Sequence, residues 1–141
     1  MVDRISKQRR SENMRRIRSK GTLAELAVRR LVHAMGFRFR LHLPTLPGKP
    51  DLVLPRLRRI IEVRGCFWHQ HTGCVDSHTP KSHVGYWYTK LRRNVQRDKH
   101  NLRALRKLGW RVLTLWECEV KELPARSLRS RLRRFLGASR R

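Results

Sequence analysis

The feature that most constrains the fold of this chain is its positive charge. Its 141 residues include 35 Lys and Arg against 10 Asp and Glu, a formal net charge of +25 at pH 7. A compact domain of this size cannot carry that charge without strong self-repulsion, so the sequence predicts a polyanionic partner. Because 39% of the residues are apolar, the chain can still bury a core, and its length suits one domain.

A nucleic acid is a better candidate for that partner than a membrane. No stretch of the sequence approaches the roughly 18 apolar residues that a membrane-spanning helix needs. Residues 1–20 are basic and polar, without the apolar centre of a signal peptide, so we expect a cytoplasmic, nucleoid-associated protein. They hold eight Lys and Arg against Asp3 and Glu12, which predicts a basic arm preceding a single domain over 21–141.

Helical periodicity predicts three helices. Thr22 and Glu25 match a capping box, in which Thr caps the helix and Glu reaches back. The helix that follows ends at Gly36 and is expected to present Leu23, Leu26, Ala27, Leu31 and Met35 on its apolar face. The other two helices are predicted over 85–108 and after Pro124.

Strands are predicted between these helices. Alternating apolar and polar residues indicate a strand over 37–42, and short apolar runs indicate strands over 51–54, 60–63 and 110–116. A five-residue turn at 55–59 makes the middle two a hairpin, whereas 43–50 and 65–83 have the composition of loops. This order predicts an α/β fold, a central mixed β-sheet flanked by helices.

Two acidic residues lie near the ends of the predicted hairpin. Asp51 follows Pro50, and Glu62 comes after ten intervening residues, just before Val63 and Arg64. If the hairpin forms, the two carboxylates lie near one end of the sheet, where they can hold Mg²⁺ and promote phosphodiester hydrolysis. Arg64 would then add positive charge for the developing phosphorane. The structural alternative is a salt bridge between Glu62 and Arg64.

A third acidic residue lies within an apolar stripe. Asp98 falls on the face of the long helix that carries Leu91, Val95, Leu102 and Leu105. An acid in such a stripe is costly unless it is paired. It can pair with a neighbouring Arg, or it can support a catalytic His or a metal-bound water in the proposed site.

The cysteines suggest a metal site. Cys66, His71 and Cys74 form a Cys-x4-His-x2-Cys pattern, and Cys118 follows Cys74 after 43 intervening residues. Three thiolates and one imidazole make a closed tetrahedral zinc site of the structural type. Three buried free thiols are the alternative. Zinc binding by this set leaves His69 available for chemistry.

Five ordered motifs together closely resemble the very-short-patch repair endonuclease family. They are Leu46-Pro47-Gly48-Lys49-Pro50-Asp51, Gly65-Cys66-Phe67-Trp68-His69, Asn94-Val95-Gln96-Arg97-Asp98, Gly109-Trp110-Arg111-Val112 and Trp116-Glu117-Cys118. The segment 13–18 and Glu25 are similar as well, so the resemblance covers roughly residues 11–119. It implies a PD-(D/E)xK nuclease domain with one structural zinc, which uses Mg²⁺ to cut one strand of double-stranded DNA beside a T:G mismatch.

The same resemblance implies residue roles. Asp51 would hold the catalytic Mg²⁺, with the main-chain carbonyl of Val63 as a further ligand. Glu62 is a candidate ligand from its place in the predicted hairpin, not from the resemblance. His69 would be the general base or acid, Asp98 would orient it, and Glu25 would belong to the same active-site region. The zinc ligands would be Cys66, His71, Cys74 and Cys118. The DNA-wedging aromatic residues would be Phe67, Trp68 and Trp87.

The chain departs from the family pattern at the site itself. The family places Thr and His where Val63 and Arg64 stand, has no acid at Glu62, and has a zinc loop one residue shorter at Thr72-Gly73. Arg64 cannot replace a His as a base because it stays charged.

Two alternatives to a mismatch endonuclease therefore stay open. One is a nicking or restriction-type endonuclease without mismatch preference, and the other is a non-catalytic, zinc-stabilised nucleic-acid-binding protein. The second leaves three acids unexplained in a chain with only ten. We expect a monomer, because cutting one strand needs one site, with repair proteins as a further class of partner.

Overall fold

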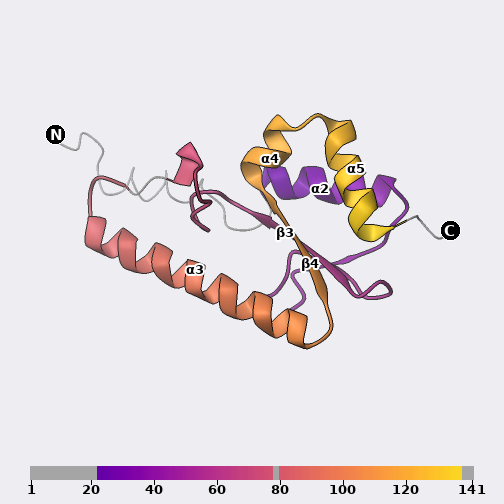
Figure 1. Cartoon of the computed structure of the whole chain (residues 1–141), viewed down its shortest axis with the longest axis horizontal. Helices are drawn as coiled ribbons and strands as arrows, with labels where there is room; N and C mark the ends of the chain where they lie inside the picture. The colour runs from indigo at the N-terminus through magenta and orange to yellow at the C-terminus, as the bar shows by residue number, and fades with distance from the viewer. Residues whose placement is uncertain (1–21, 78–79, 138–141) are drawn as a thin grey trace.

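The structure, a computed structural model, describes residues 22–77 and 80–137, so the predicted basic arm lies outside the described residues. Its elements confirm the predicted α/β fold, with a mixed four-stranded sheet in the order β1-β2-β3-β4 and helices on both sides (Figure 1). The strands are β1 (Arg40–Leu41), β2 (Leu52–Leu54), β3 (Arg59–Arg64) and β4 (Arg111–Trp116). The helices are α2 (Leu23–Ala34), η1 (Val75–Ser77), α3 (Val84–Lys107), α4 (Glu117–Glu122) and α5 (Ala125–Leu136).

The strand register brings several chain segments to one end of the sheet. The predicted hairpin is confirmed, with β2 antiparallel to β3 and Leu52 opposite Ile61. Strands β3 and β4 are parallel, a pairing that needs a long crossover, and α3 supplies it. Arg64 lies opposite Trp116 at the carboxyl ends of β3 and β4. The residues that follow these two strands therefore leave the sheet side by side.

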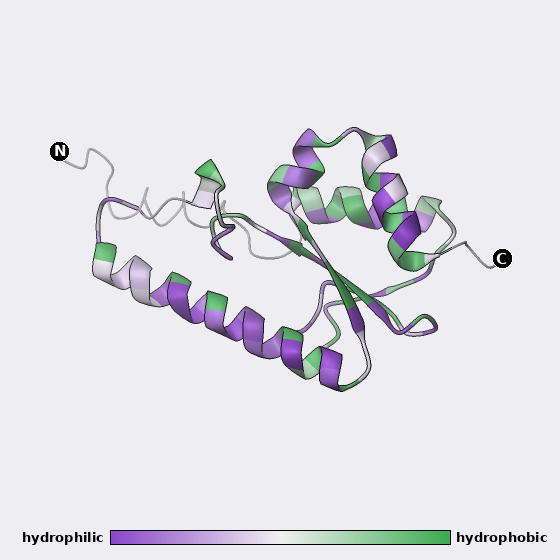
Figure 2. Cartoon of the chain, in the orientation of Figure 1, coloured by the Kyte–Doolittle hydropathy of each residue, from purple (hydrophilic) through white to green (hydrophobic). Residues whose placement is uncertain are grey.

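The two faces of the sheet have unequal cores. One face packs against α2 and α5, and buried side chains such as Val28, Ile61 and Leu132 form the larger apolar cluster. The other face meets α3, where Leu105 packs against Val53 and Ile60 in a smaller cluster. Figure 2 shows the same difference between the helices on the two faces: α2 is mostly hydrophobic, whereas α3 is mostly hydrophilic.

The apolar face predicted for α2 is confirmed only in part, because Met35 is buried and Leu31 packs against the core, but the start of the helix is rotated about its axis. Leu23 is largely exposed, and the buried positions are Ala24, Glu25, Val28 and Val32. These residues are also at helical spacing, and because they are smaller than leucine the helix can lie close to the sheet. This rotation buries the side chain of Glu25 as well.

The predicted capping box is confirmed only in part. Thr22 accepts a hydrogen bond from the Glu25 amide at 3.1 Å, as a helix cap does. The Glu25 carboxylate instead bonds to Arg29 and His42. The Glu25 carboxylate therefore bonds to side chains in the interior of the molecule and does not cap the helix.

Two other elements differ from the prediction. Strand β1 has two residues rather than six, because its partner β2 has only three and His42 adopts a left-handed φ of 46° that ends the extended run. The short helix α4 was not predicted, and it places Cys118 in a helical first turn. Within the described ranges, none of the helices has the length and apolar content needed to cross a bilayer.

Candidate active site

Three side chains from three elements converge at the end of the hairpin. Glu25 comes from α2, His42 follows β1, and Asp51 immediately precedes β2. His42 Nε2 lies 3.1 Å from Glu25 Oε1 and 3.6 Å from Asp51 Oδ1. One ligand atom of each residue lies within 4.8 Å of the others. This donor set can hold a divalent cation.

The surroundings of Asp51 favour a cation. Its Oδ2 accepts a hydrogen bond from the Val63 amide at 2.8 Å. Burial, together with the nearby carboxylates of Glu25 and Glu62, raises the pKa of Asp51 to about 8, against the lowering effect of the Val63 hydrogen bond. The carboxylates therefore lack sufficient compensating positive charge, which a bound cation would supply.

Glu62 and Arg64 lie beside this group rather than within it. Their side chains form a 2.9 Å ion pair, which is the structural alternative noted for the sequence, and both line the same cavity. The Arg64 guanidinium also lies 5.9 Å from the centre of the Trp116 ring. Its Nε is buried and has no hydrogen-bond partner among the described residues. Arg64 thus brings a positive charge to the cavity wall beside Glu62.

The predicted pairing of His69 with Asp98 is present. His69 Nδ1 lies 2.6 Å from Asp98 Oδ2, so the loop after β3 is joined to the middle of α3. Asn94, one turn before Asp98, donates a hydrogen bond to the Trp68 carbonyl at 3.2 Å and holds the same loop. A carboxylate on Nδ1 leaves Nε2 of the imidazole as the atom available for proton transfer.

Most of these groups share one cavity of about 580 Å³, whereas Glu25 and His42 are not among the residues that line it. Its wall includes Asp51, Glu62, Arg64, His69 and Asp98. A second hollow of about 610 Å³ is lined by residues of α3, including Lys90 and Arg93, and it shares Asn94 and Arg97 with the first. The carboxylates of the first cavity therefore lie next to a basic surface along α3.

The four predicted zinc ligands also come together. One ligand atom each of Cys66, His71, Cys74 and Cys118 lies within 4.8 Å of the others. His71 Nδ1 is 3.7 Å from Cys66 Sγ and 3.4 Å from Cys118 Sγ. The His71 ring stacks on Trp116, with centroids 4.2 Å apart and planes 9° from parallel. This group can hold a metal, and its sulfur-rich composition suits Zn²⁺.

Without a cation the thiols favour their protonated form. Burial raises the pKa of the Cys66 thiol to about 12, and burial also raises that of Cys118. A metal that binds here must displace those protons, which couples its binding to pH.

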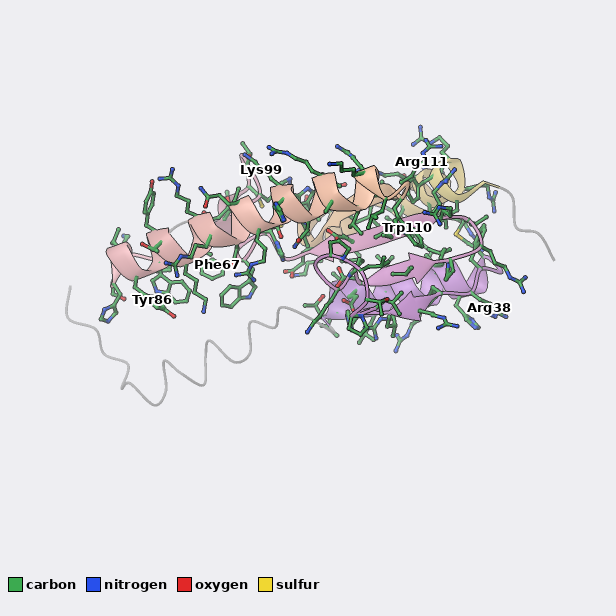
Figure 3. All side chains as sticks on the ribbon, turned by 90° about the horizontal axis from the view of Figure 1, so that it is seen from below. Arg38, Phe67, Tyr86, Lys99, Trp110 and Arg111 are labelled. Atoms are coloured by element: carbon green, nitrogen blue, oxygen red, sulfur yellow. The ribbon has the colours of Figure 1, made fainter. Side chains whose placement is uncertain are left out.

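The three predicted wedge residues form one aromatic group at the amino-terminal end of α3. Phe67 lies 5.2 Å from Trp68 and 5.5 Å from Trp87, measured between ring centres, and Lys90 Nζ lies over Trp68 and Trp87. All three rings are half-buried, and neither apolar core cluster includes them. Figure 3 shows Phe67 with Tyr86 beside this end of α3, far from Arg38 and Trp110.

The sequence analysis missed His42 and Arg29. The position of His42 in the sequence gives no sign of a role in the site. Only the chain reversal between β1 and β2 brings it to Asp51. Arg29 was detectable, since it stands four residues after Glu25 on one helix, the spacing at which an acid and a base meet.

Comparison with known proteins identifies the family. The family model described as "DNA mismatch endonuclease Vsr" matches residues 2–75. Over 145 residues, covering 99% of this chain and 92% of the relative, the chain is 37% identical to the DNA mismatch endonuclease Vsr of Escherichia coli K12. The chain belongs to the Vsr family.

Other Vsr-like relatives are named as nicking enzymes. The chain is 48% identical over 139 residues to the type II nicking enzyme V.XorIIP of Xanthomonas oryzae pv. oryzae, covering 99% of this chain and 100% of the relative. It is 39% identical over 121 residues to V.NmeAIP of Neisseria meningitidis, covering 86% of each. Membership of the Vsr family makes the chain a DNA endonuclease and implies a divalent cation in its chemistry.

Proposed function

We propose that this Vsr-family endonuclease nicks one DNA strand at or beside a T:G mismatch, by Mg²⁺-dependent phosphodiester hydrolysis in mismatch repair. The observation that carries the proposal is the single cavity onto which both the carboxylates and the His69–Asp98 pair open. A cation site and a proton-transfer group facing one space are what hydrolysis of a phosphodiester needs.

Each side chain in the cavity has a proposed role. Asp51 holds the cation, with Glu25, Glu62 and the Val63 carbonyl as its other candidate ligands. When bound there, Mg²⁺ supplies charge neutralisation and a water of lowered pKa.

His69 and Arg64 act on the reacting groups from the wall of the same cavity. Asp98 fixes the His69 imidazole through Nδ1, so that Nε2 can take a proton from the attacking water or give one to the leaving oxygen. Arg64 lines the cavity and offers its positive charge to the phosphate.

The basic surface beside the cavity suits the backbone of the substrate. Lys90, Arg93 and Arg97 line the hollow that adjoins the catalytic cavity along α3. Phosphate contacts of this kind position a duplex without choosing its sequence. The protein acts as a monomer on nucleoid DNA, because a single-strand cut requires one site.

The aromatic group is the proposed mismatch reader. Phe67, Trp68 and Trp87 lie outside both core clusters. Phe67 and Trp68 belong to the loop that follows Cys66, and Trp87 belongs to α3. A structural Zn²⁺ at Cys66, His71, Cys74 and Cys118 would make that loop rigid, which lowers the entropy cost of insertion. Inserting a ring between base pairs costs a few kcal/mol, and less at a mismatch, where pairing is already weak.

A nicking assay tests the catalytic part of the proposal. Supercoiled plasmid incubated with the protein and Mg²⁺ should become open circles, with no product when Mg²⁺ is omitted. Duplexes that differ only in one T:G pair should be cut at least about tenfold faster than matched ones, since a mismatch lowers the cost of unstacking.

A double variant tests the aromatic group. Phe67→Ala with Trp68→Ala should fold and keep salt-sensitive DNA binding, yet lose most of the preference for T:G. Tyr88→Ala is the matched control, because Tyr88 is an exposed aromatic on α3 whose hydroxyl bonds to Arg92. If the double variant unfolds, the rings are structural rather than reading groups.

A second candidate function is nicking without mismatch preference. Relatives named type II nicking enzymes and the Glu62–Arg64 pair, which departs from the family pattern, favour it. Equal rates of cutting on matched and T:G duplexes would select it over mismatch repair.

A further inference from the structure

In the group formed by Glu25, His42 and Asp51, the histidine is the least expected member. Its imidazole lies between two carboxylates in a site that the proposed function assigns to a cation with oxygen ligands. The His42 backbone has a φ of 46°, and its amide donates to the Asp51 carbonyl at 3.1 Å. A left-handed conformation is unfavourable for a residue with a side chain, and such conformations gather at functional sites. In His42 the left-handed backbone occurs together with a side chain whose Nε2 lies beside Asp51.

The hydrogen bonds of the two carboxylates leave one oxygen of each for the imidazole. Glu25 Oε2 is taken by Arg29, and Asp51 Oδ2 is taken by the Val63 amide. The other two oxygens, Glu25 Oε1 and Asp51 Oδ1, both face His42 Nε2. Partners that hold one side of a ligand and orient its other side are typical of metal centres. Glu25 is also only 1% exposed, so its position is fixed by the core.

The separations suit a shared ion. Neighbouring ligand atoms around one octahedral cation, each roughly 2.1 Å from it, lie roughly 3 Å apart. The two separations from His42 Nε2 are 3.1 and 3.6 Å. Only a small adjustment would let all three atoms bind one ion.

We infer that His42 is a direct ligand of the catalytic cation, so that Glu25, His42 and Asp51 form a site that prefers a first-row transition cation to Mg²⁺. The inference rests on the proposed function, since it concerns the same site. Mg²⁺ favours oxygen ligands, whereas imidazole favours transition metals. Mn²⁺ is the most demanding probe of this preference because it is the weakest binder of its series.

Binding of Mn²⁺ to the full chain as purified tests the inference without any assay of cleavage. Calorimetry should give an affinity at least about tenfold higher for Mn²⁺ than for Mg²⁺. Pulsed electron paramagnetic resonance of the bound Mn²⁺ should show coupling to a ¹⁴N nucleus. In His42→Gln the coupling should vanish, and the Mn²⁺ affinity should fall by about tenfold while that for Mg²⁺ changes less. His33→Gln, which removes an exposed histidine of α2, should change neither quantity.

The outcomes separate this inference from the proposed function. Bound Mn²⁺ without ¹⁴N coupling in the wild type, or equal losses of both affinities in His42→Gln, would overturn the inference. The wild-type spectrum decides the matter even if His42→Gln does not fold. If Asp51→Asn binds both ions as the wild type does, the proposed catalytic site itself is misplaced.

Discussion

Two groups of potential metal ligands stand at the same end of the sheet, and they are built from different chemistry. Glu25, His42 and Asp51 offer two carboxylates and an imidazole next to an open cavity. Cys66, His71, Cys74 and Cys118 offer three thiols and an imidazole around a buried Cys66. Hard oxygen ligands suit a cation that exchanges water and substrate, whereas soft thiolates suit a closed structural zinc site. The comparison separates a group whose ligands suit chemistry from a group whose ligands suit a structural role.

The strand topology explains why the two groups are neighbours. The parallel pair β3 and β4 ends at Arg64 and Trp116, and the chain then continues directly to Cys66 and Cys118. Trp116 links the thiol-containing group to the cavity, because His71 stacks on its ring and the Arg64 guanidinium, at the cavity wall, lies 5.9 Å from the ring centre. A change in one group can therefore be tested for its effect on the other.

The largest effect is expected from Asp51→Asn. Removing the charge of the central carboxylate should lower the nicking rate by about 10³-fold or more, because the cation loses its main ligand. Metal content at the thiol group and thermal stability should not fall. A variant that cuts plasmid at near the wild-type rate would refute the catalytic assignment.

The next effect concerns the thiol group. Cys118→Ser should remove the bound Zn²⁺ and lower the free energy of unfolding by about 3 kcal/mol or more, since the metal holds β4 to the loop after β3. The melting temperature should fall by roughly 10 °C. Elemental analysis and thermal unfolding measure the two changes together. Unchanged stability, or native protein without zinc, would show that the four residues are simply buried groups.

A smaller loss is expected from Asp98→Asn. The amide cannot hold the His69 ring in one tautomer and one orientation as the carboxylate does. The nicking rate should therefore fall by about 10²-fold. Because the role is positioning, the pH–rate profile should also shift, while DNA affinity stays unchanged. Nicking rates measured across pH distinguish this from simple unfolding. An unaltered profile in a folded variant would argue against the role.

The last effect, small per pH unit, is a dependence of stability on pH in the absence of a bound cation. The folded pKa of Asp51, about 8, lies above its ordinary value of 3.8, so between these values the folded state keeps a proton that the unfolded chain releases. Stability should therefore fall as pH rises through this range, by at most about 1.4 kcal/mol per pH unit, and level off above about pH 8.

Urea unfolding of wild type and Asp51→Asn checks this slope. Measurements between about pH 6 and pH 8.5 avoid acid loss of thiolate-bound metal, which needs deprotonated ligands. The wild-type slope should be absent in Asp51→Asn, and Mg²⁺ should reduce it in the wild type. A slope that persists in the variant would assign it to other groups.

Some features of this protein follow from the sequence alone. The charge balance predicted a nucleic-acid partner, and periodicity predicted the hairpin, the long helix and the final helix. The ligand set Cys66, His71 and Cys74 was predictable because its spacing lies within one loop. His69 and Asp98 were predictable as candidates because an acid in an apolar stripe needs a partner.

The tertiary structure decided which groups meet across elements. The rotation of α2 that buries Glu25 depends on how closely small side chains let the helix approach the sheet. Helical periodicity alone does not distinguish this rotation from one that would turn Leu23 and Ala27 toward the core. The meeting of His42 with Asp51 depends on the pairing of two very short strands. Local patterns report which face a residue occupies, whereas contacts between distant segments come from packing, which the whole chain determines at once.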